Sequence, residues 1–340
     1  MNVLYERDVA ADVLRGRRIA VLGFGSQGRA QALNLKDSGH EVVVGLRPES
    51  PTRAEASAAG LTVCELAEAV RGAHVVMLLI PDEVQAEVFR TVVQPNLRRT
   101  AYLGFAHGFA IHFRQIVPAS DTNVFLVAPK GVGPMVRQHF LAGGGVPALV
   151  AVQQDPAGDT REVALAYACA LGCGRAGILE TTFRDETETD LFGEQAVLCG
   201  GLVELIRTAF ETLVEAGYSP ELAYFECLHE VKLIADLVHQ YGITGMRSRI
   251  SRTATYGGLT RGPRVIGPAT RQVLRALLAE IQSGAFAREW LDEHATGRRR
   301  MNALAARETE HPIEEVGRRL RAMMPWLTNA APSLGPAPAT

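Results

Sequence analysis

The sequence carries almost no excess charge of either sign. Its 340 residues contain 35 Lys and Arg against 37 Asp and Glu, which gives a formal net charge of −2. The strong positive field that attracts nucleic acids or anionic lipids is therefore lacking. This balance predicts no nucleic-acid partner and favours a small molecule as the ligand.

Long hydrophobic runs are lacking too. The longest strongly apolar stretch, Val75 to Ile80, is far shorter than the ~20 residues of a membrane-spanning helix. Arg7 and Asp8 precede any stretch that could serve as the apolar part of a signal peptide. We therefore expect a soluble, cytoplasmic protein without a membrane partner.

Cysteine is scarce, and its spacing does not fit a metal or disulfide pattern. The five cysteines are an odd number, lie in apolar sequence and show no C-x-x-C pair. They are Cys64, Cys169, Cys173, Cys199 and Cys227. We expect reduced thiols, mostly buried, with neither a zinc site nor a disulfide framework.

What the sequence does contain, between residues 17 and 182, is an alternation of short β-branched runs with helical stretches. This alternation is typical of an α/β fold with a doubly wound parallel sheet. The length and the 47% of hydrophobic residues suffice for about two domains. The predicted strands cover residues 18–22, 42–46, 75–80, 101–105, 124–127, 148–152 and 176–179.

Beyond the predicted sheet, apolar residues recur at helical spacing, and we expect no strand there. The sequence thus predicts a nucleotide-binding Rossmann domain over residues 1–182, an all-helical domain over 183–328 and a flexible tail over 329–340. Thr187 or Thr189 is the expected N-cap of the first helix of the second domain. The longest predicted helical segments cover residues 190–216, 220–241 and 269–283.

A glycine-rich turn lies between the first predicted strand and the helix that follows it. Gly23 permits the tight turn, Gly25 lets the backbone approach a pyrophosphate, and Gly28 lets strand and helix pack together. The helix N-terminus supplies N–H donors to the anion. The order of strand, turn and helix predicts a dinucleotide cofactor. The turn comprises Gly23, Phe24, Gly25, Ser26, Gln27 and Gly28.

The loop after the second predicted strand indicates which dinucleotide binds. NAD sites usually place an acidic residue there for the ribose 2′-hydroxyl, whereas this sequence has Leu46 and Arg47. Arg47 can bind a 2′-phosphate, and Ser50 and Thr52 add hydroxyl donors. We therefore expect NADP(H), although Glu49 in the same loop argues for NAD(H), and Arg47 as a solvated loop residue is the alternative.

Two pairs of carboxylates lie four residues apart in helical sequence. Asp190 and Glu194 form one pair, and Glu226 and Glu230 form the other. Residues at this spacing share one helical face, where like charges destabilise a helix by ~0.2–0.5 kcal/mol per pair. Because both faces continue into apolar or small residues, we expect the carboxylates to face the protein interior.

Buried carboxylates must be neutralised, paired or bound to a metal. Four hard oxygen ligands without a nearby set of Cys or His ligands favour Mg²⁺, with Mn²⁺ as a substitute. Two ions bridged by one carboxylate fit this set. The alternative is a pair of surface helices with scattered acids.

Two titratable residues follow predicted strands, at the edge where doubly wound sheets bind ligands. His107 can transfer a proton or orient a water molecule, and Lys130 can stabilise a developing oxyanion or donate a proton. A purely structural histidine is the alternative for His107.

Together these motifs resemble the short-chain, class I ketol-acid reductoisomerases, which are enzymes of branched-chain amino-acid biosynthesis. The resemblance runs from about residue 2 to Leu327, and its most specific motif is the run from Glu186 to Gln195. Further matching segments cover residues 106–108, 128–131, 226–230 and 262–266.

The resemblance implies an NADP-binding Rossmann domain and a knotted, all-helical domain that completes the active site in a homodimer or larger homo-oligomer. It implies catalytic roles for His107, Lys130 and Glu194, and a substrate contact for Ser251. Two Mg²⁺ ions per site would be held by Asp190, which bridges them, by Glu194, and by Glu226 and Glu230 of the partner subunit. The implied cofactor-binding residues are Phe24, Gly25, Ser26, Gln27, Arg47, Ser50, Thr52, Asp82, Glu83, Val84, Gln85 and Gly133.

The implied reaction begins with Mg²⁺-dependent alkyl migration in a small ketol acid, 2-acetolactate or 2-aceto-2-hydroxybutyrate. Hydride transfer from NADPH then gives a 2,3-dihydroxy acid of valine or isoleucine biosynthesis. Two Mg²⁺ ions can polarise the ketone and stabilise an alkoxide during the migration. The cofactor supplies the hydride, and the protein supplies its position.

The sequence departs from the family pattern in the segment that covers residues 246–258. The family usually has Tyr-Ser before the Ile-Ser pair and Asp or Asn after it, whereas this chain has Ser-Arg before it and Arg after it. Arg249, Arg252 and Arg261 add positive charge beside Ser251. That charge favours a larger substrate or an additional carboxylate, or it pairs with acids elsewhere on the surface. Ordinary drift in a biosynthetic enzyme is the bland alternative.

Three other functions stay open on the sequence alone. A paralogue of a specialised pathway would act on a related ketol acid. A metal-independent hydroxy-acid dehydrogenase would also join a Rossmann domain to a helical domain, but it would not need the four carboxylates. A catalytically inactive NADP-binding sensor would have lost part of the catalytic set.

Overall fold

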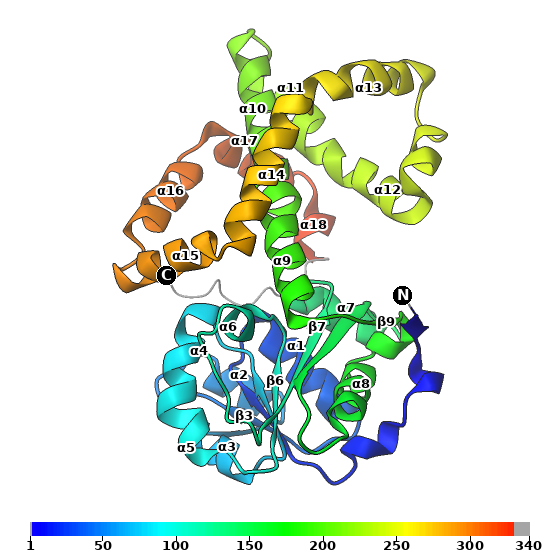
Figure 1. Cartoon of the computed structure of the whole chain (residues 1–340). Coiled ribbons are helices and arrows are strands. Elements are labelled where there is room, and N and C mark those ends of the chain that lie inside the picture. The colour runs from blue at the N-terminus through cyan, green and yellow to red at the C-terminus, as the bar shows by residue number, and fades with distance from the viewer. Residues whose placement is uncertain (1, 330–340) are drawn as a thin grey trace. The chain divides into compact units, whose positions relative to one another are not determined.

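The computed structural model describes residues 2–329, which form two compact units (Figure 1). The first unit runs to Thr187, and the second begins at Glu188. The division therefore falls inside a helix, α9 (Phe183–Gly193). The tail predicted over residues 329–340 lies outside the described residues, apart from Asn329 at the end of α18 (Pro325–Asn329).

Within residues 2–329, no helix has both the length and the apolar character needed to cross a membrane.

The first unit is built on one nine-stranded sheet. Its strands are β1 (Val3–Leu4), β2 (Ile19–Leu22), β3 (Val42–Gly45), β4 (Thr62–Cys64), β5 (Val75–Leu78), β6 (Tyr102–Phe105), β7 (Asn123–Pro129), β8 (Ala148–Gln154) and β9 (Ile178–Glu180). The strand order is β1-β9-β8-β7-β6-β5-β2-β3-β4, and the run from β4 to β7 is parallel throughout. This run has the Rossmann order, in which ligands bind where the order reverses, here between β2 and β5. The predicted fold class is confirmed.

All seven predicted strands are present. Two further short strands, β1 and β4, and two antiparallel pairings were not predicted. β1 and β4 comprise two and three residues, which is too short for a recognisable pattern. β8 runs antiparallel to β7, and β1 antiparallel to β9. A helix, α7 (Gly133–Leu141), lies between β7 and β8 just as one does in a parallel crossover, so the sequence pattern did not reveal the reversal.

Alternate residues of the central strands pack on opposite faces of the sheet. Ile19 and Val21 of β2 belong to the core shared with α1 (Ser26–Asp37) and α8 (Thr160–Ala170). Ala20 and Leu22 belong to the core on the other face, which includes α3 (Leu66–Gly72). Because both faces are covered, the strands are uniformly apolar, and ligands have access at the strand ends.

The remaining helical elements of the first unit are shorter. They are α2 (Arg53–Ala58), α4 (Asp82–Val88), α5 (Gln94–Asn96), α6 (Phe109–His112), the 3₁₀ turns η1 (Glu6–Asp8), η2 (Ala11–Leu14) and η4 (Cys173–Arg175), and the π-helical turn η3 (Phe89–Val93).

The described part of the second unit consists of helices and their connections and contains no strand, as predicted. Its small core gathers Phe210, Tyr224, Ile313, Val316 and Leu320. Its elements after α9 are the π-helical turns η5 (Glu194–Leu198) and η6 (Phe225–His229), together with α10 (Gly201–Glu215), α11 (Pro220–Tyr224), α12 (Glu230–Arg247), α13 (Arg252–Val265), α14 (Pro268–Gln282), α15 (Ala285–Ala295), α16 (Arg299–Thr309), α17 (Pro312–Ala322) and α18.

The first helix of the predicted helical domain, α9, starts earlier than predicted. The Oγ1 atom of Thr182 accepts the N–H of Asp185 at 3.0 Å and so caps α9. The predicted N-caps, Thr187 and Thr189, are wrong because both lie inside α9. The Thr187 hydroxyl instead donates to the carbonyl of Phe183, one helical turn back, at 2.7 Å.

The cysteines form no disulfide in the described part of the chain. Burial raises the pKa of Cys169 to about 11 and that of Cys173 to about 12, so both thiols stay protonated and unreactive. The prediction that the thiols are mostly buried holds only in part. Cys64 and Cys173 are buried, Cys169 and Cys227 are half-buried, and Cys199 is exposed.

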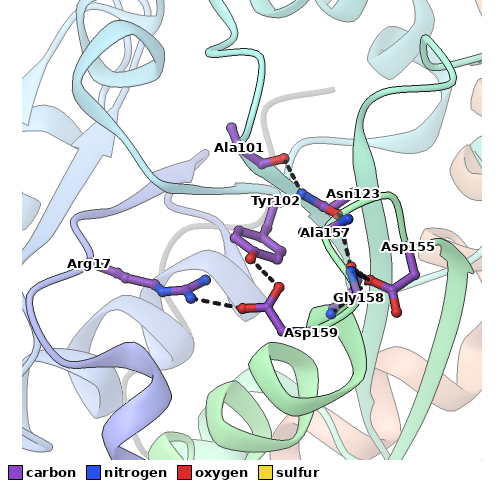
Figure 2. A network of polar contacts seen from close by, with 9 residues as sticks. Arg17, Ala101, Tyr102, Asn123, Asp155, Ala157, Gly158 and Asp159 are labelled. Atoms are coloured by element: carbon purple, nitrogen blue, oxygen red, sulfur yellow. Dashed lines mark hydrogen bonds and ion pairs between the residues drawn. The ribbon is translucent and has the colours of Figure 1, made fainter.

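A polar network joins the amino ends of three strands (Figure 2). Arg17, just before β2, donates to Asp159 Oδ2 at 3.0 Å, and the Tyr102 hydroxyl of β6 donates to Oδ1 of the same carboxylate. Asn123 at the start of β7 accepts the N–H of Ala157 at 3.0 Å. Burial and the hydrogen bond to Asp159 raise the pKa of Tyr102, so its phenol stays a donor. The network fixes the loop before α8 to the edge of the sheet opposite the glycine turn.

Replacing Tyr102 by Phe tests this network. Tyr102→Phe removes a donor to a charged acceptor, so we expect the free energy of unfolding to fall by about 1–2 kcal/mol. The melting temperature, followed by circular dichroism, should then fall by a few degrees. Tyr218→Phe is the matched control because Tyr218 is 58% exposed in the second unit. Equal melting temperatures for the two variants would contradict the stabilising role.

Candidate active site

The glycine turn lies at the switch point of the sheet and leaves no room for side chains at two positions. Gly23 has a φ of 103°, and a Cβ atom there would lie 2.5 Å from the carbonyl oxygen of Leu79. A Cβ atom on Gly28 would lie 2.3 Å from the carbonyl oxygen of Gly23. Gly25, in contrast, is exposed and has no atom within 4 Å of such a position. The turn is therefore packed from below and open where a phosphate would approach the N-terminus of α1.

The loop after β7 is fastened to this turn. The N–H of Gly133 donates to Ser26 Oγ at 3.1 Å, and Gln27 Nε2 donates to the carbonyl of Gly131 at 2.9 Å. A Cβ atom on Gly133 would lie 2.0 Å from the carbonyl oxygen of Ser26. Ser26, Gln27 and Gly133, three of the predicted cofactor residues, therefore lie together.

The loop between β3 and α2 carries the residues predicted to distinguish the two dinucleotides. Arg47 is exposed, and the Ser50 and Thr52 hydroxyl oxygens are 3.0 Å apart. Arg53 fixes this loop by donating to the carbonyl of Leu46 at 3.0 Å and to that of Arg47 at 3.4 Å. Arg53 was not predicted, because nothing in the sequence marks it as a donor to the backbone.

A second contact holds the same loop from the side of α1. Arg29, just after the glycine turn, forms an ion pair with Glu55 of α2. Its guanidinium group also lies 5.6 Å from the centroid of the Phe24 ring. The turn and the Arg47 loop are thus held together by side chains that leave Arg47 itself exposed.

His107, which follows β6, is oriented by a carboxylate that follows β5. Its Nδ1 atom lies 3.1 Å from Oδ2 of Asp82. Because a carboxylate only accepts hydrogen bonds, Nδ1 carries the hydrogen. The buried Gln85 donates to the other Asp82 oxygen at 3.0 Å and to the carbonyl of Ile80 at 3.0 Å. Asp82 and Gln85 were predicted only as cofactor-binding residues. Their contacts show a further role, because Asp82 orients the His107 ring and Gln85 holds Asp82 in place.

Lys130, which follows β7, pairs with a buried carboxylate. Its Nζ atom lies 3.0 Å from Oε1 of Glu186, whose other oxygen accepts the N–H of Gly108 at 3.0 Å. Glu186 is 1% exposed. It joins the loops after β6 and β7 to the first turn of α9. The only signal of this role in the sequence is the place of Glu186 at the start of the most specific motif, the run from Glu186 to Gln195.

We expect Glu186→Gln to destabilise the first unit. Glutamine can still accept the N–H of Gly108, but it has no charge for Lys130. The loss should be about 2 kcal/mol, typical of a hydrogen bond to a charged group. Urea unfolding followed by circular dichroism measures it, and Glu87→Gln, on an exposed position of α4, is the control. A variant as stable as this control would show that the pair does not stabilise the fold.

Each predicted carboxylate pair lies at the junction of an α-helix with a π-helical turn. Asp190 is in α9 and Glu194 begins η5, whereas Glu226 is in η6 and Glu230 begins α12. The sequence pattern predicted uninterrupted α-helices over both stretches, and the π-helical turns were not expected. π-helical turns inside helices are frequent at functional sites, where they change the direction of neighbouring side chains.

The prediction that these carboxylates face the interior of their own chain is wrong. Three of the four are exposed, and Asp190 is half-buried. The apolar residues that continue the two faces are exposed as well, with Val197 at 55% and Leu233 at 52%. Helical periodicity correctly located an apolar face, but in the single chain nothing among the described residues covers it.

The oxygen atoms of the four carboxylates suit a divalent cation, but these side chains do not converge on one position within the described part of a single chain. Carboxylate oxygens are the protein ligands that Mg²⁺ prefers. Within residues 2–329, no three Asp, Glu, His or Cys side chains converge on a possible metal position. The side chains of Glu226 and Glu230 make no hydrogen bond or ion pair with other described residues. The four carboxylates therefore do not form one metal site within the described part of a single chain.

Ser251 lies at the N-terminus of α13. Its Oγ atom accepts the N–H of Ala254 at 3.1 Å, which caps the helix. The hydroxyl hydrogen is not used in this contact, so Ser251 can still donate to a ligand. Its side chain is exposed.

A Rossmann sheet with a packed glycine turn at its switch point, and with oriented His and Lys side chains at the same strand ends, defines a nicotinamide-dependent oxidoreductase. Residues 13–177 match the acetohydroxy acid isomeroreductase, NADPH-binding domain, and residues 183–326 match the ketol-acid reductoisomerase, C-terminal domain. The chain therefore belongs to the ketol-acid reductoisomerase family, and it is an oxidoreductase that also isomerises its substrate.

Solved structures agree with this assignment. An NADH-preferring ketol-acid reductoisomerase from an uncultured archean is 47% identical, with a TM-score of 0.93 over 95% of this chain and 99% of that one. A semialdehyde dehydrogenase NAD-binding protein from Cupriavidus necator, solved with calcium and NAD, is 18% identical, with a TM-score of 0.58 over 78% of this chain and 99% of that one. The second likeness shows the fold alone. The predicted family, the enzyme class and a nicotinamide cofactor are thus confirmed.

Proposed function

We propose that this reductoisomerase rearranges a 2-acetolactate-type ketol acid by Mg²⁺-dependent alkyl migration and reduces the product with NADPH to a 2,3-dihydroxy acid. This chemistry belongs to valine and isoleucine biosynthesis. The observation that carries the proposal is the pair of carboxylate sets, each at a π-helical turn on an exposed apolar face. A metal-independent dehydrogenase has no use for such sets.

The cofactor would lie along the glycine turn. The open backbone at Gly25 and the N-terminus of α1 suit its pyrophosphate. Arg47, with the paired hydroxyl groups of Ser50 and Thr52, suits a 2′-phosphate, and this set supports NADPH over NADH. The exposed Glu49 beside Arg47 is the one residue of this loop that opposes a phosphate.

Two Mg²⁺ ions would be held by Asp190 and Glu194 together with Glu226 and Glu230 of the partner subunit. When bound, these ions would polarise the substrate's oxygen atoms during the migration. Asp190 and Glu194 lie on consecutive helical turns, so both can contribute to one metal site. Besides binding the metal, the Glu194 carboxylate would accept a proton from the substrate or donate one to it.

The residues at the strand ends would handle the remaining charge and protons. Lys130, held by Glu186 at 3.0 Å, would stabilise negative charge on a substrate oxygen and donate a proton to it. His107, whose Nδ1–H is held by Asp82, would present Nε2 for proton transfer or to orient a water molecule. The Ser251 hydroxyl would donate to the substrate.

A second copy of the chain would complete this site. The helices α12, which is interrupted by non-helical backbone at Gly242, and α13 contain no buried residue, although they are 18 and 14 residues long. Isolated helices of that length are marginal in water, and most of their stability comes from burying an apolar face. Their exposed apolar residues include Leu233, Tyr241, Ile243 and Leu259. A homodimer or larger homo-oligomer would cover this face and place the second carboxylate pair at the partner's site.

Dependence on Mg²⁺ is the first test. We expect NADPH consumption with 2-acetolactate only when Mg²⁺ is present, because the migration requires the polarised oxygens. Asp190→Asn should abolish this activity. Asp236→Asn, which removes an exposed acid of α12 that pairs with Lys232, should retain it. Turnover of 2-acetolactate in the presence of a chelator would refute the proposed mechanism.

Complementation tests the shared site. Asp190→Asn and Glu226→Gln should each be inactive, whereas co-expression of the two should restore about a quarter of the wild-type activity. Half of randomly formed dimers then contain both variants, and each of these has one intact site of two.

The matched control pairs two variants on the same side of the site. Asp190→Asn co-expressed with Glu194→Gln should restore nothing, because every site then lacks one of the two. Size-exclusion chromatography with light scattering confirms that mixed assemblies form. Equal activity of the two mixtures would contradict a site shared between subunits.

Cofactor choice gives a separate test. We expect Arg47→Gln to raise the KM for NADPH by about tenfold and to change that for NADH much less, because only NADPH has the phosphate for which Arg47 donates. Arg90→Gln, an exposed arginine of η3, is the control. A wild-type enzyme with a higher kcat/KM for NADH would show that Glu49 dominates the loop.

A further inference from the structure

The second unit contains a long segment without an acidic residue. Residues 237–279 include no Asp or Glu, although the chain has 37 of them. The segment covers the end of α12, all of α13 and most of α14, which are yellow to orange in Figure 1. It contains seven arginines: Arg247, Arg249, Arg252, Arg261, Arg264, Arg271 and Arg275.

These arginines have no anionic partner within the described part of the chain. Six of the seven are exposed, and none forms an ion pair there. Some arginines on other helices of the same unit do pair with acids, as Arg207 does with Glu204 and Arg318 with Glu315. The segment differs in that it contains no acid with which its own arginines could pair. The alternative that Arg249, Arg252 and Arg261 pair with acids elsewhere on the surface is thus wrong for the single chain. An uncompensated positive segment favours an anion that comes from outside it.

One of these guanidinium groups is held in place close to Ser251. Arg249 lies 3.6 Å from the centroid of the Tyr241 ring. It also donates to the carbonyl of Gly245 at 3.0 Å and to Ser248 Oγ at 3.2 Å. Stacking and two hydrogen bonds restrict the side chain, and its remaining N–H donors are available for a ligand.

Arg252 adds a second positive charge at an unfavourable place. It is the first residue of α13, directly after Ser251, which is the N-cap. A cation at a helix N-terminus opposes the helix dipole, which favours anions there. The charge of Arg252 therefore does not stabilise its own helix. An anionic ligand would give this charge a partner.

We propose that Arg249 and Arg252 bind a second carboxylate of the substrate, which is then a 2-acyl-2-hydroxy dicarboxylic acid. This inference rests on the proposed function. In the proposed site the four carboxylates balance two Mg²⁺ ions, and Lys130 is already paired with Glu186. A monocarboxylic ketol acid brings one carboxylate for two guanidinium groups, whereas a side-chain carboxylate supplies the second anion and matches their fork of donors.

The reaction on this substrate is balanced by the cofactor alone. The carboxyalkyl group leaves C2 and bonds to C3 with its electron pair, the C2 hydroxyl loses its proton to become a ketone, and the former ketone oxygen on C3 gains a proton. The hydride of the reduced nicotinamide then adds to C2, and a proton adds to its oxygen. The product is a 2,3-dihydroxy dicarboxylic acid, and the nicotinamide is oxidised.

The experiment compares 2-acetolactate with its analogue in which a carboxyethyl group replaces the C2 methyl group. With saturating NADPH and Mg²⁺, we expect the wild-type kcat/KM for the dicarboxylic substrate to be at least about tenfold higher. Arg249→Gln and Arg252→Gln should each lower it about tenfold or more, mainly through KM, and should lower the value for 2-acetolactate by a smaller factor. Arg252→Lys should recover part of the loss.

Arg271→Gln is the matched control because it removes an exposed charge from the same acid-free segment, on α14. Preference for 2-acetolactate, or equal losses on both substrates, would overturn the proposal and leave the reductoisomerase function standing. Turnover of neither substrate would overturn both. Melting temperatures and light scattering accompany each variant. If Arg249→Gln or Arg252→Gln dissociates the assembly, the arginines pair with the partner's acids, and the proposal is wrong.

Discussion

The buried carboxylate of Glu186 is the contact on which the arrangement of the strand-end residues depends. Burying a carboxylate is unfavourable unless its oxygens are satisfied, and here one oxygen accepts the N–H of Gly108 while the other pairs with Lys130. The two partners follow neighbouring strands, β6 and β7, and Glu186 itself lies in the first turn of α9. The first turn of α9 is therefore anchored by the same charge that fixes both loops.

In the proposed function, the exposed carboxylates would link metal binding to assembly. Each chain presents two like-charged pairs on faces that are otherwise apolar, and an apolar face of this kind favours association. If two copies associate through these faces, four carboxylates meet, and their repulsion opposes association until cations neutralise them. Ligands that bind only the assembled state stabilise it by mass action. Metal content and oligomeric state should therefore be coupled in this enzyme.

The sequence predicted local features better than distant pairings. Strand, turn and helix around Gly23 are adjacent in the chain, so one pattern revealed them. The contacts of His107 with Asp82 and of Lys130 with Glu186 join residues 25 and 56 positions apart, and no periodicity connects them. The antiparallel β8 was missed because its connection contains a helix. The carboxylate faces were located correctly, but periodicity shows only that a face is to be covered, and it does not distinguish the same chain from a second copy.

The arginine segment is unbalanced in charge. The 37 acidic residues among 340 correspond to one in about nine positions, whereas residues 237–279 contain none. Exposed charges contribute little to stability, so the fold of a single chain does not require these arginines. Where a partner subunit covers the segment, repulsion among its arginines is less screened and more unfavourable. Retaining Arg249 and Arg252 beside Ser251 is then disadvantageous unless an anion binds there, and a substrate with a second carboxylate supplies that anion during each catalytic cycle.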